Sequence, residues 1–145
     1  LTSSVITEEA LRAVAVLQER GVSVNHLHVS TLKPFTDPKV LDALRKANNG
    51  IITMENHSIV GGLGSAVAEL MAEHGIACPL TRLGMRDIYA HGASKNYLMK
   101  EYELDAMALV KNVARVLNRD LEIAESDLLS ARIDAVHSAA KAEAL

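Results

Sequence analysis

The stretch that most constrains the fold is residues 51–75. It opens with the apolar run "IITM" at residues 51–54, which has the length and residue types of a strand buried on both faces. Further on, three of the four residues 61–64 are glycine, which predicts a tight turn. Apolar residues then recur at helical spacing over residues 63–71, until Gly75 closes the helix. A buried strand that turns sharply into a half-buried helix is typical of a parallel sheet covered by helices.

Other segments show the same alternation. Thr7 is predicted to cap a helix that ends at Gly21, and Asp37 is predicted to cap one that starts with Pro38. Asp105 is predicted to cap a helix that reaches Leu117. Strands are predicted at residues 22–29 and 79–83, and residues 86–103 are expected to be irregular, with one helical turn.

Together these segments predict a three-layer α/β/α domain with a mostly parallel sheet over residues 1–117. Residues 118–145 are rich in alanine and are expected to add a further C-terminal helix that lies on another surface. Its apolar positions at helical spacing are Leu129, Ile133, Val136 and Ala140.

Composition excludes several classes of protein. A length of 145 residues fits one domain, and the net charge of -3 leaves no basic surplus for nucleic-acid binding. Cys78 is the only cysteine, which rules out an internal disulfide and a multi-cysteine zinc site and fits the reducing cytoplasm. No apolar run is long enough to span a membrane.

The glycine turn allows two interpretations. Backbone N–H groups at the start of the following helix could bind an anion, or Gly61, Gly62 and Gly64 could simply permit a tight turn and close helix packing. The dinucleotide fingerprint is incomplete, because Val67 stands where its third glycine belongs. No Gly-Lys-Ser/Thr follows either, so the plain turn is favoured.

Side chains beside the turn are further candidates. Glu55 and His57 lie on one face of an extended chain, where they could act as an acid/base pair, cap the turn or face a subunit contact. The loop after Arg82 could hold a phosphate or form a solvated interface rim, and the rim is favoured. His26 and His28 also share a face, but a metal site there would need further ligands that the sequence does not bring together.

The order of these motifs resembles the C-terminal domain of the transketolase family of thiamine diphosphate enzymes, especially the C-terminal subunit of transketolases split into two polypeptides. The family pattern is a Lys-Pro loop, a strand ending in Glu-x-His, a GGxG turn into a helix, and an RxG segment. The resemblance covers residues 1–117. The matching positions are Lys33, Pro34, Glu55, His57, Gly61, Gly62, Gly64, Arg82 and Gly84.

Related C-terminal domains occur in deoxyxylulose-phosphate synthases and in the β subunits of 2-oxo acid dehydrogenases, although Glu-x-His favours transketolase. The resemblance implies an enzyme that transfers a two-carbon ketol unit between sugar phosphates. It also implies that the diphosphate and its divalent metal are bound in an earlier domain, through a Gly-Asp-Gly motif and a downstream Asn. No Gly-Asp-Gly occurs in this sequence. The segment itself is then expected to bind no cofactor or metal, to carry no catalytic residue, and to pack on N-terminal domains or an N-terminal subunit in a homodimer.

Two departures from the family pattern matter. The family domain opens with a strand ahead of its first helix, and that strand is expected to be missing here, so the N-terminal boundary is expected to cut into the domain. Asn56 stands where the family often has a second acid. The site residues that remain are therefore an interface or anion site formed by Glu55, His57, the three turn glycines and Arg82.

Overall fold

The structure is a computed structural model in which residues 1–131 are described. Helices and strands alternate over residues 38–101 as the sequence pattern predicts, whereas residues 1–37 and 102–131 contain helices but no named strand. The helices are α1 (Ile6–Glu19), α2 (Pro38–Arg45), α3 (Leu63–Glu73), α4 (Lys95–Glu101), α5 (Ala106–Leu117) and α6 (Glu125–Ser130), and the strands are β1 (Ile51–Ser58) and β2 (Leu80–Met85). No helix in residues 1–131 is long and apolar enough to cross a membrane.

The sheet is parallel and is extended by short segments without named strands. β1 pairs in parallel with β2, with Ile51 opposite Leu80. On the other side of β1, Thr2 forms parallel bridges to both Met54 and His28. Residues 1–3 therefore lie between β1 and the chain around residue 28. The first strand was expected to be missing, but three residues occupy its position.

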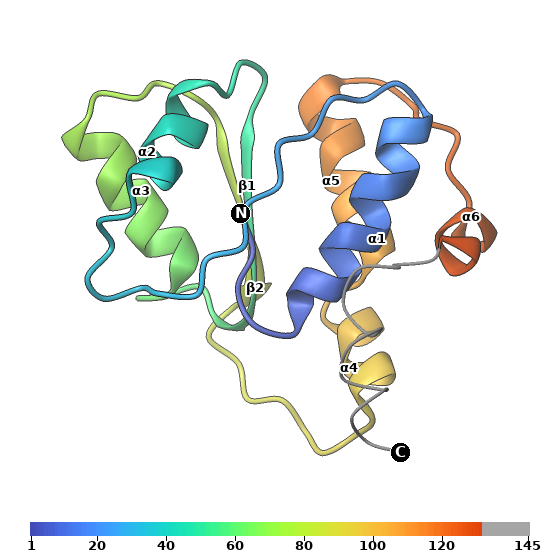
Figure 1. Cartoon of the computed structure of the whole chain (residues 1–145). Helices are drawn as coiled ribbons and strands as arrows, with labels where there is room; N and C mark the ends of the chain where they lie inside the picture. The colour runs from blue at the N-terminus through green and yellow to red at the C-terminus, as the bar shows by residue number, and fades with distance from the viewer. Residues whose placement is uncertain (132–145) are drawn as a thin grey trace, which may run out of the picture.

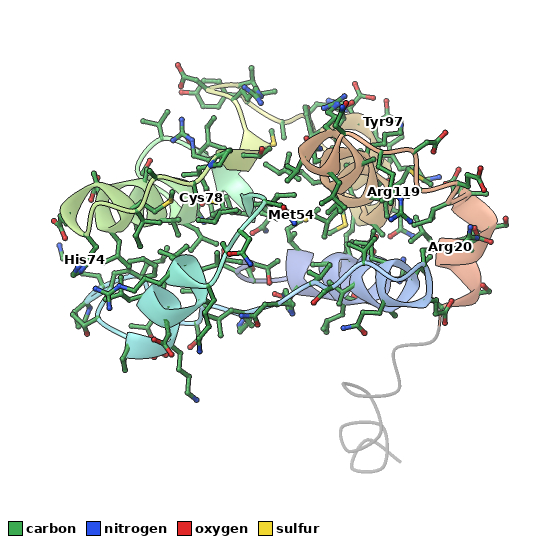
Figure 2. All side chains as sticks on the ribbon, turned by 90° about the horizontal axis from the view of Figure 1, so that it is seen from above. Arg20, Met54, His74, Cys78, Tyr97 and Arg119 are labelled. Carbon is green, nitrogen blue, oxygen red and sulfur yellow. The ribbon has the colours of Figure 1, made fainter. Side chains whose placement is uncertain are left out.

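Helices cover both faces of this sheet, so the fold has three layers (Figure 1). α2 and α3 lie on one side of β1 and β2, and α1 and α5 lie side by side on the other. β1 supplies both cores, because Ile51 faces the α2/α3 layer and Met54 faces the α1/α5 layer. Met54 accordingly sits between the two groups of side chains when the molecule is seen from above (Figure 2). The three-layer prediction is confirmed.

Two predictions in the first third of the chain are wrong. Residues 22–29 form no named strand, because only His28 has a strand-like partner, Thr2. Thr7 does not cap α1, which begins at Ile6. The Thr7 hydroxyl instead lies 2.7 Å from Nδ1 of His28, so the side chain ties the helix to the sheet rather than to its own backbone.

The last third also differs from prediction. Residues 95–101 form a helix of two turns, α4, capped by the Ser94 hydroxyl at the Tyr97 N–H, where one turn was expected. The C-terminal helix was expected over the whole of residues 118–145, but residues 121–124 are not helical and α6 has six residues. Leu128 is its buried residue, whereas Leu129, predicted to be on the apolar face, is 76% exposed. The remaining part of that prediction, including Ile133, Val136 and Ala140, lies outside the described residues.

The caps predicted from Asp37 and Asp105 are confirmed. Asp37 accepts a hydrogen bond from the Lys39 N–H at 2.9 Å, ahead of Pro38 in the first position of α2. Asp105 accepts one from the Ala108 N–H at 2.9 Å.

Candidate functional site

The candidate site lies at the carboxyl end of β1. The apolar run was predicted to end at Met54, but β1 continues to Ser58 and carries Glu55 and His57 within the strand. The β1–β2 register is interrupted between Met54 and Ser58, so the strand is irregular where these two side chains leave it. The turn at residues 59–62 then leads into α3.

Glu55 is the central residue of this site. Its side chain is fully buried. Its two carboxylate oxygens accept hydrogen bonds from the Leu63 N–H at 2.6 Å and the Gly64 N–H at 2.9 Å, the first two N–H groups of α3. The residue in the N-cap position, Gly62, has no side chain that could make such bonds. Glu55 therefore supplies, from a neighbouring strand, the negative charge that a helix start favours.

Three glycines around Glu55 leave no room for a Cβ atom, each against a different neighbour. A Cβ atom on Gly62 would lie 2.1 Å from Oε2 of Glu55 and 2.6 Å from the Ser58 carbonyl oxygen. A Cβ atom on Gly64 would lie 2.6 Å from Cδ of Arg82. One on Gly84 would lie 2.7 Å from the side chain of Ile59 and 3.0 Å from Cγ of Glu55. Gly61 has a different role, since its φ of +74° is a conformation that favours glycine.

His57 forms the exposed side of the site. Its Nδ1 lies 3.2 Å from Oε2 of Glu55 and 3.2 Å from the Ser58 carbonyl oxygen, while 47% of the side chain is exposed. The ring is thus held through one nitrogen at the edge of a buried carboxylate. The strand spacing correctly indicated that Glu55 and His57 could meet.

Arg82 closes the site from β2. Its Nη1 donates to the Ile59 carbonyl oxygen at 3.2 Å and lies 3.5 Å from Oγ of Ser65. Ser65 itself donates to the Ile59 carbonyl oxygen and accepts from the Gly61 N–H. The guanidinium thus holds the turn in place. Thr53, whose buried hydroxyl has no partner in the described part of the chain, lies beside Gly64 under Arg82.

The structure therefore brings all six predicted site residues together and gives Glu55 an internal partner. Two of the N–H groups that an external anion would use at α3 are already bonded to that carboxylate. This geometry favours the tight-turn interpretation of the glycines. The interface and anion interpretations of the site stay predictions.

The histidine pair of the second candidate site is tied to the sheet by threonines. His26 Nε2 lies 2.9 Å from Oγ1 of Thr2, and His28 Nδ1 lies 2.7 Å from Oγ1 of Thr7. Burial lowers the pKa of His26 to about 4, helped by the positive amino group of Leu1 and by His28. Within residues 1–131 no group of three or more His, Cys, Asp or Glu side chains could hold a metal ion.

Sequence reasoning missed Glu9, which acts at α5 as Glu55 acts at α3. Glu9 is largely buried, and its Oε2 accepts a hydrogen bond from the Ala106 N–H at 3.0 Å, at the first residue of α5. Nothing in the local pattern indicated this contact, because the acceptor and donor are 97 positions apart.

The three-layer fold with a carboxylate-capped GGxG turn defines an α/β/α domain with a parallel sheet. The model of the transketolase C-terminal domain family matches residues 1–109. The chain belongs to that family.

Two curated relatives are themselves described as parts of transketolases. The chain is 34% identical over 112 residues to a putative transketolase C-terminal section of Methanocaldococcus jannaschii, which covers 77% of this chain and 34% of that protein. It is 35% identical over 119 residues to a 6-deoxy-6-sulfo-D-fructose transketolase subunit of a Clostridium species, which covers 82% of this chain and 36% of that protein. The chain thus spans about a third of the length of these relatives.

Other relatives have a different activity. The chain is 34% identical over 113 residues to a 1-deoxy-D-xylulose-5-phosphate synthase of Chlorobium phaeovibrioides, covering 78% of this chain and 18% of that enzyme. Among solved structures, one described as a split-gene transketolase in an inactive β4 tetramer has a TM-score of 0.69 and 29% identity, covering 81% of this chain and 37% of that one.

Transketolases and deoxyxylulose-phosphate synthases are thiamine diphosphate enzymes. Within residues 1–131 no group of three or more His, Cys, Asp or Glu side chains could hold a metal ion, and the first two N–H groups of α3 are bonded to Glu55. That this segment binds neither the cofactor nor its metal stays a prediction.

Proposed function

We propose that this chain is the C-terminal domain of a transketolase that transfers a two-carbon ketol unit between sugar phosphates. In this proposal the domain completes the assembly by packing on N-terminal thiamine diphosphate-binding domains, or on a separate N-terminal subunit, within a homodimer in the cytoplasm. The domain alone is inactive. The thiamine diphosphate and the divalent metal belong to the partner.

The observation that carries the proposal is that relatives of 34% and 35% identity bear the names of a transketolase section and a transketolase subunit. The site geometry supports it as well. Glu55 is hydrogen-bonded to the start of α3, and Arg82 is hydrogen-bonded to the turn. Both side chains therefore stabilise the conformation of this surface. The His57 side chain is 47% exposed, so it can contact another polypeptide.

Reconstitution tests the proposal. The chain is mixed with the polypeptide that carries the Gly-Asp-Gly motif and is encoded before it or beside it. We expect neither polypeptide alone to convert a ketose phosphate and an aldose phosphate, and we expect the mixture to do so with added thiamine diphosphate and Mg²⁺. Formation of 1-deoxy-D-xylulose 5-phosphate by the mixture, when pyruvate replaces the ketose phosphate as the two-carbon donor, would instead establish the activity named for other relatives.

Calorimetry of the isolated chain provides the second arm. We expect no saturable heat on addition of thiamine diphosphate with Mg²⁺, and a clear saturable isotherm would contradict the proposal. Titration with inorganic phosphate, followed through the amide signals of Leu63 and Gly64, tests the remaining alternative of a phosphate-binding regulatory module. Those signals are expected to stay unchanged, because both N–H groups are bonded to Glu55.

A further inference from the structure

The imidazole of His57 is held through one of its two nitrogens. Its Nδ1 lies 3.2 Å from Oε2 of Glu55 and 3.2 Å from the carbonyl oxygen of Ser58. Within residues 1–131 the other ring nitrogen, Nε2, has no hydrogen-bond partner. Because nearly half of the side chain is exposed, a group from another polypeptide can reach the ring.

The surroundings of Nδ1 decide which ring nitrogen carries the hydrogen atom. The carbonyl oxygen of Ser58 can only accept a hydrogen bond, and so can the ionised carboxylate of Glu55. Oε2 of Glu55 already accepts one from the Leu63 N–H at 2.6 Å. A lone pair on Nδ1 would therefore face other lone pairs. The hydrogen atom lies on Nδ1, and the uncharged ring has its lone pair at Nε2.

A buried carboxylate keeps the ring in this orientation. Glu55 is fully buried, and its two oxygens accept from the Leu63 and Gly64 N–H groups at the start of α3. The carboxylate cannot rotate away from the imidazole without losing these bonds. The lone pair of Nε2 is thus oriented before a partner binds, which reduces the conformational entropy lost when a contact forms.

Exposed side chains with apolar surface lie at the same edge of the sheet. The turn after β1 is joined to the end of β2, because the Ile59 N–H donates to the Met85 carbonyl oxygen at 3.0 Å. Three large side chains stay exposed in the turn and in the chain that follows β2. They are Val60, Ile88 and Tyr89. Exposed apolar and aromatic side chains are typical of surfaces that another polypeptide covers.

We propose that Nε2 of His57 accepts a hydrogen bond from a donor group on the N-terminal domain or subunit. The identity of this partner rests on the proposed function. Once the contact excludes water, the lone pair requires a donor, which is a hydroxyl group, an amide N–H or the N–H of a lysine or arginine. A carboxylate or carbonyl oxygen in that place would face the lone pair with no hydrogen atom between them. The chemistry of the ring therefore selects a donor as the partner group.

The position of the ring hydrogen is tested first, in the isolated chain. At about pH 8 an ordinary histidine is uncharged, and NMR of the isotope-labelled ring nitrogens shows which of them carries hydrogen. We expect His57 to carry it on Nδ1 alone and the exposed His74 to show both forms in exchange. A hydrogen atom on Nε2 of His57 would overturn the inference. This measurement needs no partner, so its failure is distinct from failure of the proposed function.

Two substitutions separate the contact with Glu55 from the contact with the partner. In His57→Asn the amide nitrogen takes the place of Nδ1, and nothing takes the place of Nε2. In His57→Gln the amide reaches the place of Nε2 but no longer donates to Glu55. We expect His57→Asn to keep the urea midpoint of the isolated chain and to raise the Kd for the polypeptide with the Gly-Asp-Gly motif about tenfold. We expect His57→Gln to lower the urea midpoint and to raise this Kd about threefold or less.

His74→Asn is the matched control, because it makes the same substitution at an exposed position outside the site. It is expected to change the Kd, measured by calorimetry, by less than about twofold. An unchanged Kd for His57→Asn, or equal rises for the two His57 variants, would overturn the inference. A His57 ring that carries hydrogen on both nitrogens in the complex would also contradict it, because such a ring meets an acceptor.

Discussion

Glu55 combines two properties that rarely occur together, full burial and a negative charge. The cost of removing the carboxylate from water is offset by the two N–H donors of α3 and by the positive end of the helix. Replacement by an amide keeps the shape but presents an NH₂ group to one of those donors. We expect Glu55→Gln to lower the free energy of unfolding by about 2–3 kcal/mol, measured by urea denaturation.

Glu69→Gln is the matched control. Glu69 lies on the exposed face of the same helix, so its loss is expected to change the free energy of unfolding by less than about 0.5 kcal/mol. Equal effects of the two substitutions would show that the Glu55 carboxylate does not stabilise the start of α3.

Gly62 gives a second prediction at the same site. In Gly62→Ala the new methyl group would overlap the Glu55 carboxylate and the Ser58 carbonyl oxygen, which is backbone and cannot rotate away. We expect the free energy of unfolding to fall by about 2 kcal/mol or more and the chain to refold more slowly, because the Glu55 contacts form less readily. Stopped-flow unfolding and refolding measure both effects. Gly92→Ala is the control, because no atom lies within 4 Å of a Cβ at that position; a similar loss there would contradict the steric explanation.

For individual residues, the sequence indicated the members of the site better than it indicated their contacts. Spacing placed Glu55 and His57 on one face, and the glycines marked the turn. The partner of Glu55 could not be predicted, because the chain must turn back on itself before the N–H groups eight and nine positions later reach the carboxylate. The contact of Glu9 could not be predicted for the same reason, since local pattern does not reveal a donor on α5.

Among the elements, α6 is the most instructive, because two adjacent leucines have opposite environments. Leu128 is 3% exposed and packs with the core formed by α1 and α5, whereas Leu129 is 76% exposed. We expect Leu128→Ala to lower the free energy of unfolding by about 2–3 kcal/mol and Leu129→Ala to change it by less than about 0.5 kcal/mol. Thermal denaturation of both variants measures the difference, and a reversed order would show that α6 packs through its other face.

The extended segment at residues 22–29 gives α1 and the sheet a pH dependence through His26. The pKa of this imidazole falls from 6.5 to about 4 on folding, mainly through burial, so the unfolded chain binds more protons between these values. The stabilisation is therefore complete above pH 6.5 and is lost as the pH falls toward 4. Because His26 is only half-buried, we discount the full shift to about 1 kcal/mol.

Comparison with His26→Gln isolates this contribution. The amide can keep the bond to Thr2 but does not titrate near neutrality. We expect the free energy of unfolding of the original chain to fall by about 1 kcal/mol more than that of the variant between pH 6.5 and 4. His74→Gln, at an exposed position, is expected to keep the original pH profile; parallel profiles for His26→Gln and the original chain would refute the prediction.

Elements with strong local signals were predicted well. Asp37 before Pro38 and the stripe from Leu63 mark α2 and α3, and the structure has both. The segment at residues 22–29 has strand-forming residues, but a strand also requires a bonded neighbour, and only Thr2 provides one. The position of α6 depended on which leucine meets α1, and helical spacing alone could not choose between adjacent residues.

For the whole molecule, the central expectation is that stability is independent of metal and cofactor. Residues 1–131 offer no cluster of metal ligands, and their cores are apolar. We expect the melting temperature of the isolated chain to stay within about 1 °C on addition of EDTA or of thiamine diphosphate with Mg²⁺. A rise of several degrees in the melting temperature on addition of the cofactor would show that this chain binds it. That result would contradict the proposal that the cofactor is bound by the partner.

The three-layer architecture itself was predictable from the sequence, because alternating strands and helices leave few ways to cover a parallel sheet. The division of the core into two clusters was less predictable from the sequence. Met54 and Ile51 both belong to one apolar run, and only the pleat of β1 sends them to opposite layers.

The position of Thr2 between His28 and Met54 has a consequence for how the chain folds. The first pairing closes a loop of 26 residues and the second one of 52, and doubling a loop costs only about 0.6 kcal/mol more in chain entropy. Neither closure is therefore strongly favoured over the other on entropic grounds. Either pairing can therefore form first, and the second pairing then completes the parallel sheet around residues 1–3.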